Sequence, residues 1–351
     1  MSRTEAFILH DAHAAAGAVF RDRRGQTVVA SYGDPDGEYA AALDGAGLVD
    51  LAERGVLEVS GPQRQKFLQG MLSNDVLRPP GQGCRAALLT TKGHVQALLR
   101  VLVGKDTLRL ETDSSRLDLV RGTLEHHRVA APVRFAARPT AVLAALGLRA
   151  GERLEKAGAH PLPHEPEAHV RVTIAGHEAV VVRAGDLPGG GFVLHVAPEA
   201  ARPVWDALCA AGARPVGREA LDALRVETLR PWYEQDVSEE NLLHETGLVA
   251  ECHAAIKGCY LGQETVARLE GRGGNVNKAL RRLSLAAPAA PGSAMRAEER
   301  DVGRVTTAAV SPRYGPVAMG YIHRSHFAPG AVVQIDGAPA TVVASFEERA
   351  P

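Results

Sequence analysis

The segment of this chain with the most chemical character is the octapeptide of residues 257–264, Lys-Gly-Cys-Tyr-Leu-Gly-Gln-Glu. Gly258 removes steric cover from the thiol of Cys259, and Lys257 supplies a positive charge that favours the reactive thiolate form. Glycine also lets the backbone approach a ligand closely. The alternative is a turn that carries a buried cysteine, because most isolated cysteines behave as small hydrophobic residues. The octapeptide alone leaves both interpretations open.

A helix is predicted to start at Gln263, so Cys259 also lies near a helix N-terminus, which lowers the pKa of a thiol. Arg268, Arg272 and Lys278 then surround a glycine-rich stretch and form a flexible basic segment. This segment could contact a carboxylate-bearing ligand. A solvated basic loop is an equally good interpretation.

A second candidate for chemistry is Glu227, which follows a predicted helix in the segment Arg-Val-Glu-Thr of residues 225–228. A carboxylate has two acceptor oxygens, which match two adjacent N–H donors on the edge of a flat nitrogen heterocycle. An ion pair with Arg230 on a solvated surface is the alternative. Trp232 and Tyr233 lie nearby and could stack on a flat ring, although core packing explains them as well.

The cysteines give little sign of a disulfide or metal framework. The chain has Cys84, Cys209, Cys252 and Cys259. Four dispersed cysteines are too few for a set of disulfides, so in a reducing compartment we expect free thiols. Six residues separate the two nearest cysteines, which is wider than the spacing in a structural zinc site. We expect no metal site, and a site built from Cys252, His253 and Cys259 is the minority alternative.

Composition and charge argue against several classes of function. The 351 residues are 45% hydrophobic and 23% charged, which is ordinary for a soluble globular protein of two or three domains. Lys and Arg total 40 against 41 Asp and Glu, so the net charge of −1 gives no footprint for nucleic acid or an anionic membrane. No stretch resembles a signal peptide or the roughly 20 apolar residues of a membrane span. These features predict a cytoplasmic protein.

The hydrophobic periodicity predicts two similar units of strands and helices, followed by a barrel. The first unit is expected to contain strands at 56–60, 86–90, 95–103 and 107–111, a helix near 67–72, and a second helix capped by Asp113. The second unit is expected to contain strands at 170–174, 179–182 and 192–196 and helices at 199–211 and 218–225. Helices that lie on antiparallel strands define the α+β class.

The last quarter of the chain predicts a small β-barrel. Its short strands are expected at 281–285, 302–310, 317–322, 332–335 and 341–345, with Gly and Pro turns between them. The resulting expectation is three domains, at residues 1–137, 138–279 and 280–351.

The octapeptide is similar to the signature of the YgfZ family, which are folate-binding relatives of the glycine-cleavage T-protein that act in iron–sulfur cluster maintenance. Other segments resemble the T-protein (aminomethyltransferase) superfamily in the same order, namely residues 44–60, 67–76, 225–227 and 303–321. The octapeptide is the specific element, and the other segments place the chain only in the superfamily. The resemblance implies a cloverleaf of two related antiparallel α+β domains and a C-terminal β-barrel.

The resemblance also implies a ligand and the residues of its site. The ligand would be tetrahydrofolate or a one-carbon derivative, bound between the first two units with Glu227 on the pterin ring. The residues so implied are Cys259 in catalysis, and Glu227, Tyr233, Lys257, Gln263 and Arg268 in cofactor binding. Cys259 would lie near the mouth of the pocket as a nucleophile, a redox group or a thiol that handles a cluster.

One segment departs from the aminomethyltransferase pattern. Within residues 93–99, those enzymes have a glycine followed by paired aspartates, whereas this chain has Ala97 and Leu98. Neither side chain can donate, accept or hold charge, so the acid/base group of the transfer reaction is lost. We therefore predict a folate-binding factor that supports assembly or repair of iron–sulfur enzymes, with iron–sulfur proteins or their assembly machinery as partners. The alternatives are a folate-dependent one-carbon transferase and a non-catalytic scaffold.

Overall fold

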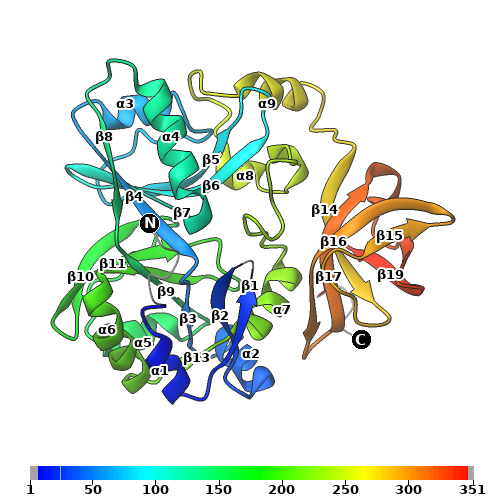
Figure 1. Cartoon of the computed structure of the whole chain (residues 1–351), viewed down its shortest axis with the longest axis horizontal. Helices are drawn as coiled ribbons and strands as arrows, with labels where there is room; N and C mark the ends of the chain where they lie inside the picture. Colours follow the sequence, from blue (N-terminus) through cyan, green and yellow to red (C-terminus); the bar gives the residue numbers. More distant parts are fainter. Residues whose placement is uncertain (1–6, 24, 347–351) are drawn as a thin grey trace.

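Two mainly antiparallel sheets and a closed barrel form the protein, in a computed structural model that describes residues 7–23 and 25–346 (Figure 1). Helices cover the sheets, so the architecture confirms the expected α+β class. None of the described helices is long and apolar enough to cross a membrane.

The first sheet has the strand order β5-β6-β7-β4-β8, and all of its neighbouring strands are antiparallel. Its strands are β4 (Arg54–Ser60), β5 (Gly83–Leu89), β6 (Val95–Val103), β7 (Thr107–Asp113) and β8 (Arg134–Arg138). Helices α3 (Arg64–Gln69) and α4 (Leu117–Arg128) pack on it through one hydrophobic cluster. The carboxylate of Asp113 accepts from the Ser115 amide at 2.9 Å, which caps the short helix η1 (Ser114–Arg116) as the sequence predicts.

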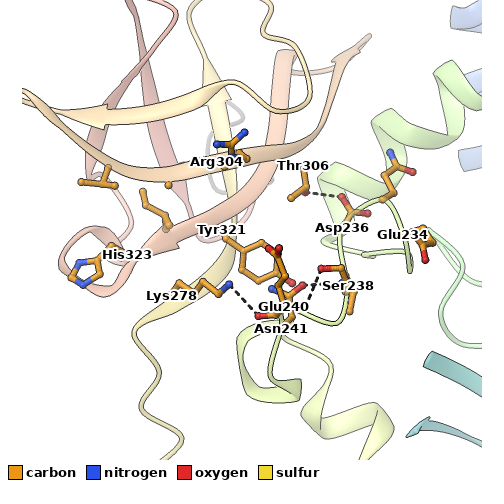
Figure 2. A pocket seen from close by; sticks show the side chains of 15 residues that line it. Glu234, Asp236, Ser238, Glu240, Asn241, Lys278, Arg304, Thr306, Tyr321 and His323 are labelled. Carbon is orange, nitrogen blue, oxygen red and sulfur yellow. Dashed lines mark hydrogen bonds between the residues drawn. The ribbon is translucent and has the colours of Figure 1, made fainter. Parts of the chain in front are cut away.

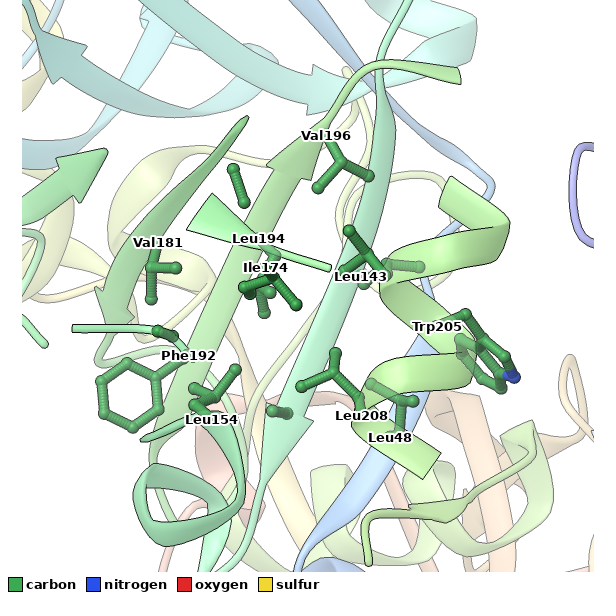
Figure 3. Close-up of a cluster of buried hydrophobic side chains, with 14 of the residues drawn as sticks. Leu48, Leu143, Leu154, Ile174, Val181, Phe192, Leu194, Val196, Trp205 and Leu208 are labelled. Carbon is green, nitrogen blue, oxygen red and sulfur yellow. The ribbon is translucent and has the colours of Figure 1, made fainter. Parts of the chain in front are cut away.

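The second sheet has the order β10-β11-β12-β9-β3-β13 and lies between two layers of helices. Its strands are β3 (Gly47–Asp50), β9 (Ala141–Leu146), β10 (His169–Ile174), β11 (His177–Ala184), β12 (Gly191–Val196) and β13 (Arg214–Pro215). Helices α1 (His10–Ala15), α5 (Ala150–Lys156) and α6 (Pro198–Ala210) cover one face, where Leu143, Leu194 and Trp205 pack together (Figure 3). Helices α2 (Pro35–Leu43) and α7 (Arg218–Thr228) cover the other face.

Helices α1 and α2 and strand β3 precede the first sheet in the sequence, but they pack with the second sheet. Strand β3 pairs with β9, and the hairpin of β1 (Val19–Arg23) and β2 (Gln26–Ser31) lies against α7. The chain then builds the first sheet over residues 54–138 before it returns to the second. The expected boundary at residue 137 therefore does not divide the packing into two consecutive units.

The C-terminal barrel closes in the order β14-β17-β16-β15-β18-β19. Its strands are β14 (Lys278–Leu285), β15 (Ala294–Ala297), β16 (Arg300–Ser311), β17 (Gly315–His323), β18 (Val332–Ile335) and β19 (Ala338–Val343), with the turn η3 (Arg324–His326) after β17. Helix α7 contacts β16 and so joins the barrel to the second sheet (Figure 1). The segment between α7 and β14 contains η2 (Leu243–Glu245), α8 (Val249–Cys252) and α9 (Gln263–Glu270).

A buried ionic network joins the two sheets. Arg100 on β6 donates to Glu111 on β7 at 2.9 Å, to Glu167 at 2.7 Å, and to Asp186. His195 on β12 contacts the same Glu111 carboxylate at 2.8 Å. Although burial opposes ionisation, the Arg100 guanidinium holds the pKa of Glu111 well below its usual range. One cation thus pairs with three carboxylates, of which one lies on the first sheet and two lie in loops beside the second sheet.

Candidate functional site

A cavity of about 400 Å³, which we call the central pocket, lies where the N-terminal hairpin, the first sheet and α7 meet. The hairpin contributes Arg23, Gly25, Gln26 and Val28, the first sheet and its flanks contribute Glu53 and Asp113 to Ser115, α7 contributes Arg218, and the loop after α7 contributes Trp232 to Gln235. Pockets that bind small molecules commonly have this size and combine flat apolar surfaces with a few polar groups.

Trp232 forms the aromatic wall of the central pocket. The guanidinium carbons of Arg225, Arg218 and Arg54 lie 4.2, 4.4 and 5.3 Å from the ring centroid. The Trp232 backbone amide donates to Asp236 at 2.9 Å, which fixes the start of the loop. The ring is therefore held by cation–π contacts in one orientation.

Tyr233 lies beside it and is almost fully buried. Its hydroxyl donates to the carbonyl oxygen of Val95 at 3.1 Å, and the Arg116 guanidinium lies 5.0 Å from its ring centroid. Tyr233 is thus a sequence-predicted site residue that does line the pocket, and its ring position is fixed by the first sheet.

Glu53 and Arg218 supply the polar groups of the central pocket. They form an ion pair in which both side chains are about nine-tenths buried. Although burial opposes ionisation, Arg218 holds the pKa of Glu53 below its usual range. Glu53 Oε2 and Arg218 Nη1 are buried without a hydrogen-bond partner among the described residues. Unpartnered buried groups are costly, and a ligand in this pocket that offers one donor and one acceptor would satisfy both.

Lys257 of the octapeptide anchors the segment to the first sheet's helix layer. Its ammonium donates to the carbonyl oxygens of Gln69 at 2.9 Å, Asn74 at 2.9 Å, and Leu72. These carbonyls lie at the C-terminus of α3 and in the turn that follows it. The helix dipole favours a cation at a helix C-terminus. Burial lowers the pKa of Lys257 to about 8. The lysine therefore holds the loop in place with a charge already committed to backbone acceptors.

The second half of the octapeptide is also docked. Tyr260 is buried, and its amide donates to Gln263 Oε1 at 3.2 Å, while the Leu261 amide donates to the carbonyl of Gly70 at 3.1 Å. Gly262 adopts a φ of +80°, and a Cβ there would lie 2.3 Å from the carbonyl oxygen of Thr90. Only glycine fits this approach to β5.

Between these two anchors the backbone leaves Cys259 exposed. Gly258 before it has open space around it, and Ile256 is 102% exposed. Cys84 and Cys252, in contrast, are buried, and burial raises the pKa of Cys84 to about 11 and that of Cys252 to about 12. The alternative in which Cys259 is a buried structural cysteine therefore does not describe this loop.

Glu227 lies in the last turn of α7, because the helix continues to Thr228 rather than ending at residue 225 as the sequence suggests. The Tyr39 hydroxyl donates to Glu227 Oε2 at 2.8 Å. Burial raises the pKa of Glu227, against the opposing effects of Ser311, Tyr39 and Arg313. The carboxylate is thus placed where α7 meets α2 and the barrel, and it is not among the residues that line the central pocket.

The expected site residues therefore occupy three places. Tyr233 lines the central pocket, Glu227 lies at the barrel, and Lys257, Cys259 and Gln263 form the loop on the first sheet. Arg268 is exposed on α9. Glu53 and Arg218 carry no sequence motif that marks them as site residues, and only the fold pairs them.

Ala97 and Leu98 sit on β6 and are both buried. Ala97 packs in the hydrophobic cluster under the first sheet, and Leu98 packs on the other face with Tyr233 and Tyr260. The positions that hold aspartates in the resembled enzymes are therefore apolar and dry in this chain.

Comparison with known proteins gives matches over nearly the whole chain. The family described as the GCVT N-terminal domain matches residues 9–255. A chloroplastic Arabidopsis thaliana protein, named provisionally as a transferase, is 28% identical over 314 residues, which are 88% of this chain and 72% of that protein. An aminomethyltransferase of Saccharopolyspora erythraea is 27% identical over 339 residues, which are 93% and 92% of the two chains.

Among solved structures, the glycine cleavage system aminomethyltransferase T from Bartonella henselae superposes with a TM-score of 0.86. The match covers 96% of both chains at 22% sequence identity. At this identity the similarity establishes the fold, including the terminal barrel.

Proposed function

The chain belongs to the GCVT N-terminal domain family, and from this membership we propose that it binds tetrahydrofolate or a one-carbon derivative and supports assembly or repair of iron–sulfur enzymes. The central pocket supports the first part of the proposal. The exposed thiol of Cys259, held between two docked ends of its loop, supports the second.

The pterin ring would lie in the central pocket beside Trp232 and Tyr233. The pyrimidine edge of a pterin presents an N–H donor next to a carbonyl acceptor. These two groups match the unpartnered Glu53 Oε2, which accepts, and Arg218 Nη1, which donates. This donor and acceptor pair is the single observation that carries the ligand proposal.

A supporting factor fits the site better than a transferase. Ala97 and Leu98 leave β6 without an acid or base next to the pocket, so proton transfer at the folate nitrogen has no group on that strand. Cys259 would instead provide the chemistry, and its exposure suits a thiol that meets another protein. The octapeptide's similarity to the YgfZ signature favours iron–sulfur proteins or their assembly machinery as that partner.

Calorimetric titration with tetrahydrofolate tests the ligand. We expect saturable heat with the native chain and at least about tenfold weaker binding in Glu53→Gln, because an amide N–H₂ would then face the ligand's donor. Glu58→Gln, on the same part of the chain but paired with Arg138, should bind as the native chain does. If binding heat is unchanged in Glu53→Gln but lost in Glu227→Gln, the ring binds at the α7–barrel junction instead. No heat with the native chain would refute folate binding.

Genetic complementation tests the thiol. In a strain that lacks this gene, the native chain should restore the activity of an iron–sulfur enzyme, and Cys259→Ser should not, because a hydroxyl has neither the nucleophilicity nor the redox chemistry of a thiol. Cys209→Ser, which changes a partly buried cysteine on α6, is the matched control and should restore activity. Full restoration by Cys259→Ser at equal protein level would remove the thiol from the mechanism.

A folate-dependent one-carbon transferase is the second candidate, since several relatives are named aminomethyltransferases. Turnover of a methylamine-type donor with tetrahydrofolate would establish that activity. The apolar positions of Ala97 and Leu98 predict no such turnover.

A further inference from the structure

A second cavity, of about 520 Å³, lies between the barrel and the loop after α7; we call it the barrel pocket (Figure 2). The loop contributes Glu234 to Ser238, Glu240 and Asn241, and the barrel contributes Lys278, Val302 to Arg304, Thr306 and Tyr321 to His323. Glu234 and Gln235 also line the central pocket, so the two cavities adjoin along this loop. A single extended ligand could therefore reach both.

Tyr321 contributes to the wall of the barrel pocket a buried hydroxyl without a partner in the described part of the chain. The residue is only 9% exposed, and its hydroxyl has no hydrogen-bond partner among the described residues. Figure 2 shows the Tyr321 side chain beside the Lys278 ammonium and the loop residues Glu240 and Asn241. A buried hydroxyl without a partner costs free energy, which an acceptor atom of a ligand would recover.

Two cations accompany this hydroxyl. The Lys278 ammonium lies 5.5 Å from the centroid of the Tyr321 ring, 3.3 Å from the carbonyl of Glu240 and 3.8 Å from the carboxylate of Glu245. Arg304 donates to the carbonyl of Gly292 at 3.2 Å and has no ion-pair partner within residues 7–23 and 25–346. Both side chains have N–H groups left for a further acceptor.

The buried carboxylate in the wall does not oppose an anion, because it is already saturated. Asp236 accepts from Arg225 and from the Trp232 amide through one oxygen, and from Thr306 at 2.7 Å and Thr307 at 2.6 Å through the other. Its charge is matched by a fully buried guanidinium.

Two further carboxylates line the pocket. Glu234 lies 3.4 Å from the Arg116 guanidinium, which offsets its charge. Glu240 is exposed, and its carboxylate would weaken the attraction for an anion by a modest amount.

We infer that the barrel pocket binds a ligand carboxylate, with Tyr321 and Lys278 as donors and Arg304 at longer range. The chemical class is a glutamate-type acid, which has two carboxylates at flexible spacing. It could be the glutamate tail of the folate whose ring occupies the central pocket, in which case the inference rests on the function proposed above, or a free amino acid of that type.

Titration calorimetry with four probes separates these sources. The probes are tetrahydrofolate, a tetrahydropterin without the aminobenzoylglutamate tail, 4-aminobenzoyl-L-glutamate, and L-glutamate. For tetrahydrofolate and 4-aminobenzoyl-L-glutamate we expect about tenfold weaker binding in Lys278→Met and about fivefold weaker binding in Tyr321→Phe, with the tail-less pterin unaffected. Glu240→Gln should strengthen binding about twofold. Arg296→Met changes a barrel cation that is paired with Asp301, and it should have no effect.

The outcomes distinguish the inference from the proposed function. The inference would be overturned if Lys278→Met and Tyr321→Phe left the affinity for tetrahydrofolate unchanged and neither 4-aminobenzoyl-L-glutamate nor L-glutamate gave heat. Folate binding would remain intact in that case. Binding of L-glutamate or 4-aminobenzoyl-L-glutamate that depends on Lys278, without binding of either pterin probe, would support the carboxylate site and overturn folate binding. No heat with any probe would overturn both.

Discussion

Replacing Arg100 with methionine is expected to destabilise the protein by about 3–5 kcal/mol, which is a large part of the 5–15 kcal/mol that holds a typical domain folded. The reason is that Glu111 and Glu167 would remain buried without the Arg100 guanidinium, and Asp186 would keep only its ion pair with Arg85. Urea denaturation followed by circular dichroism measures the loss. The matched control is Arg138→Met, which breaks an exposed ion pair of the same sheet and should leave the urea midpoint nearly unchanged, because solvent screens exposed charges.

The pH dependence of this loss has a defined sign. In the native chain Arg100 lowers the pKa of Glu111, so this ion pair stabilises the fold above the unfolded pKa of a glutamate, about 4.3, and the stabilisation is lost as the pH falls through the lower folded value. In Arg100→Met the buried carboxylates bind protons more tightly in the folded state, so the variant should lose stability as the pH rises. The stability gap between the two chains should therefore be wider at pH 8 than at pH 5. A gap of equal size at both values would show that the network contributes by packing alone.

Gly262→Ala should release the octapeptide from the first sheet. The residue has a φ of +80°, which costs an alanine about 1 kcal/mol or more, and the new Cβ would lie 2.3 Å from the Thr90 carbonyl oxygen and 2.9 Å from Leu89 Cβ. The backbone must shift, so we expect a local loss of about 2–4 kcal/mol. Hydrogen exchange of the α9 amides should accelerate at least about thirtyfold, since each 1.4 kcal/mol is a factor of ten.

Gly258→Ala is the matched control within the same octapeptide. A Cβ at residue 258 would meet no atom within 4 Å, and the residue does not have a positive φ. We expect α9 exchange in this variant to match the native chain. If the α9 amides exchanged at the same rate in both variants, Gly262 would not be needed to dock the octapeptide. The two glycines would then serve only to leave Cys259 exposed.

Local periodicity predicted much of the fold because many of its strands pair with neighbours in sequence. The hairpin of β5 and β6 was expected at 86–90 and 95–103 and occurs at Gly83–Leu89 and Val95–Val103. The expected barrel strand at 317–322 likewise lies within β17, Gly315–His323. Strand β3 was missed, since its four residues pair with β9 about 100 residues later and carry no local signal.

Site residues that lie within one short motif could be predicted from the sequence. Site residues that only the fold brings together could not. The octapeptide identified the loop that exposes Cys259, because a thiol between glycine and an anchoring lysine is a short-range pattern. Glu53 and Arg218 carry no motif, and they pair only because the turn before β4 and the start of α7 meet at the central pocket. Tyr321 and Lys278 were seen only as a barrel strand and part of a basic segment, since their shared cavity depends on a loop from another part of the chain.

Because β9 pairs with the earlier strand β3, the two sheets can form only in a fixed order during synthesis on the ribosome. Residues 54–138 form a sheet whose strands are contiguous in sequence, so that sheet can close as soon as it leaves the exit tunnel. Strand β3 must wait for β9, which at synthesis rates of about 5–20 residues per second is a delay of roughly 5–20 s. During that interval β3 and the apolar face of α2 have no partner sheet. The N-terminal segment is therefore the part of the nascent protein for which we expect the greatest dependence on chaperones.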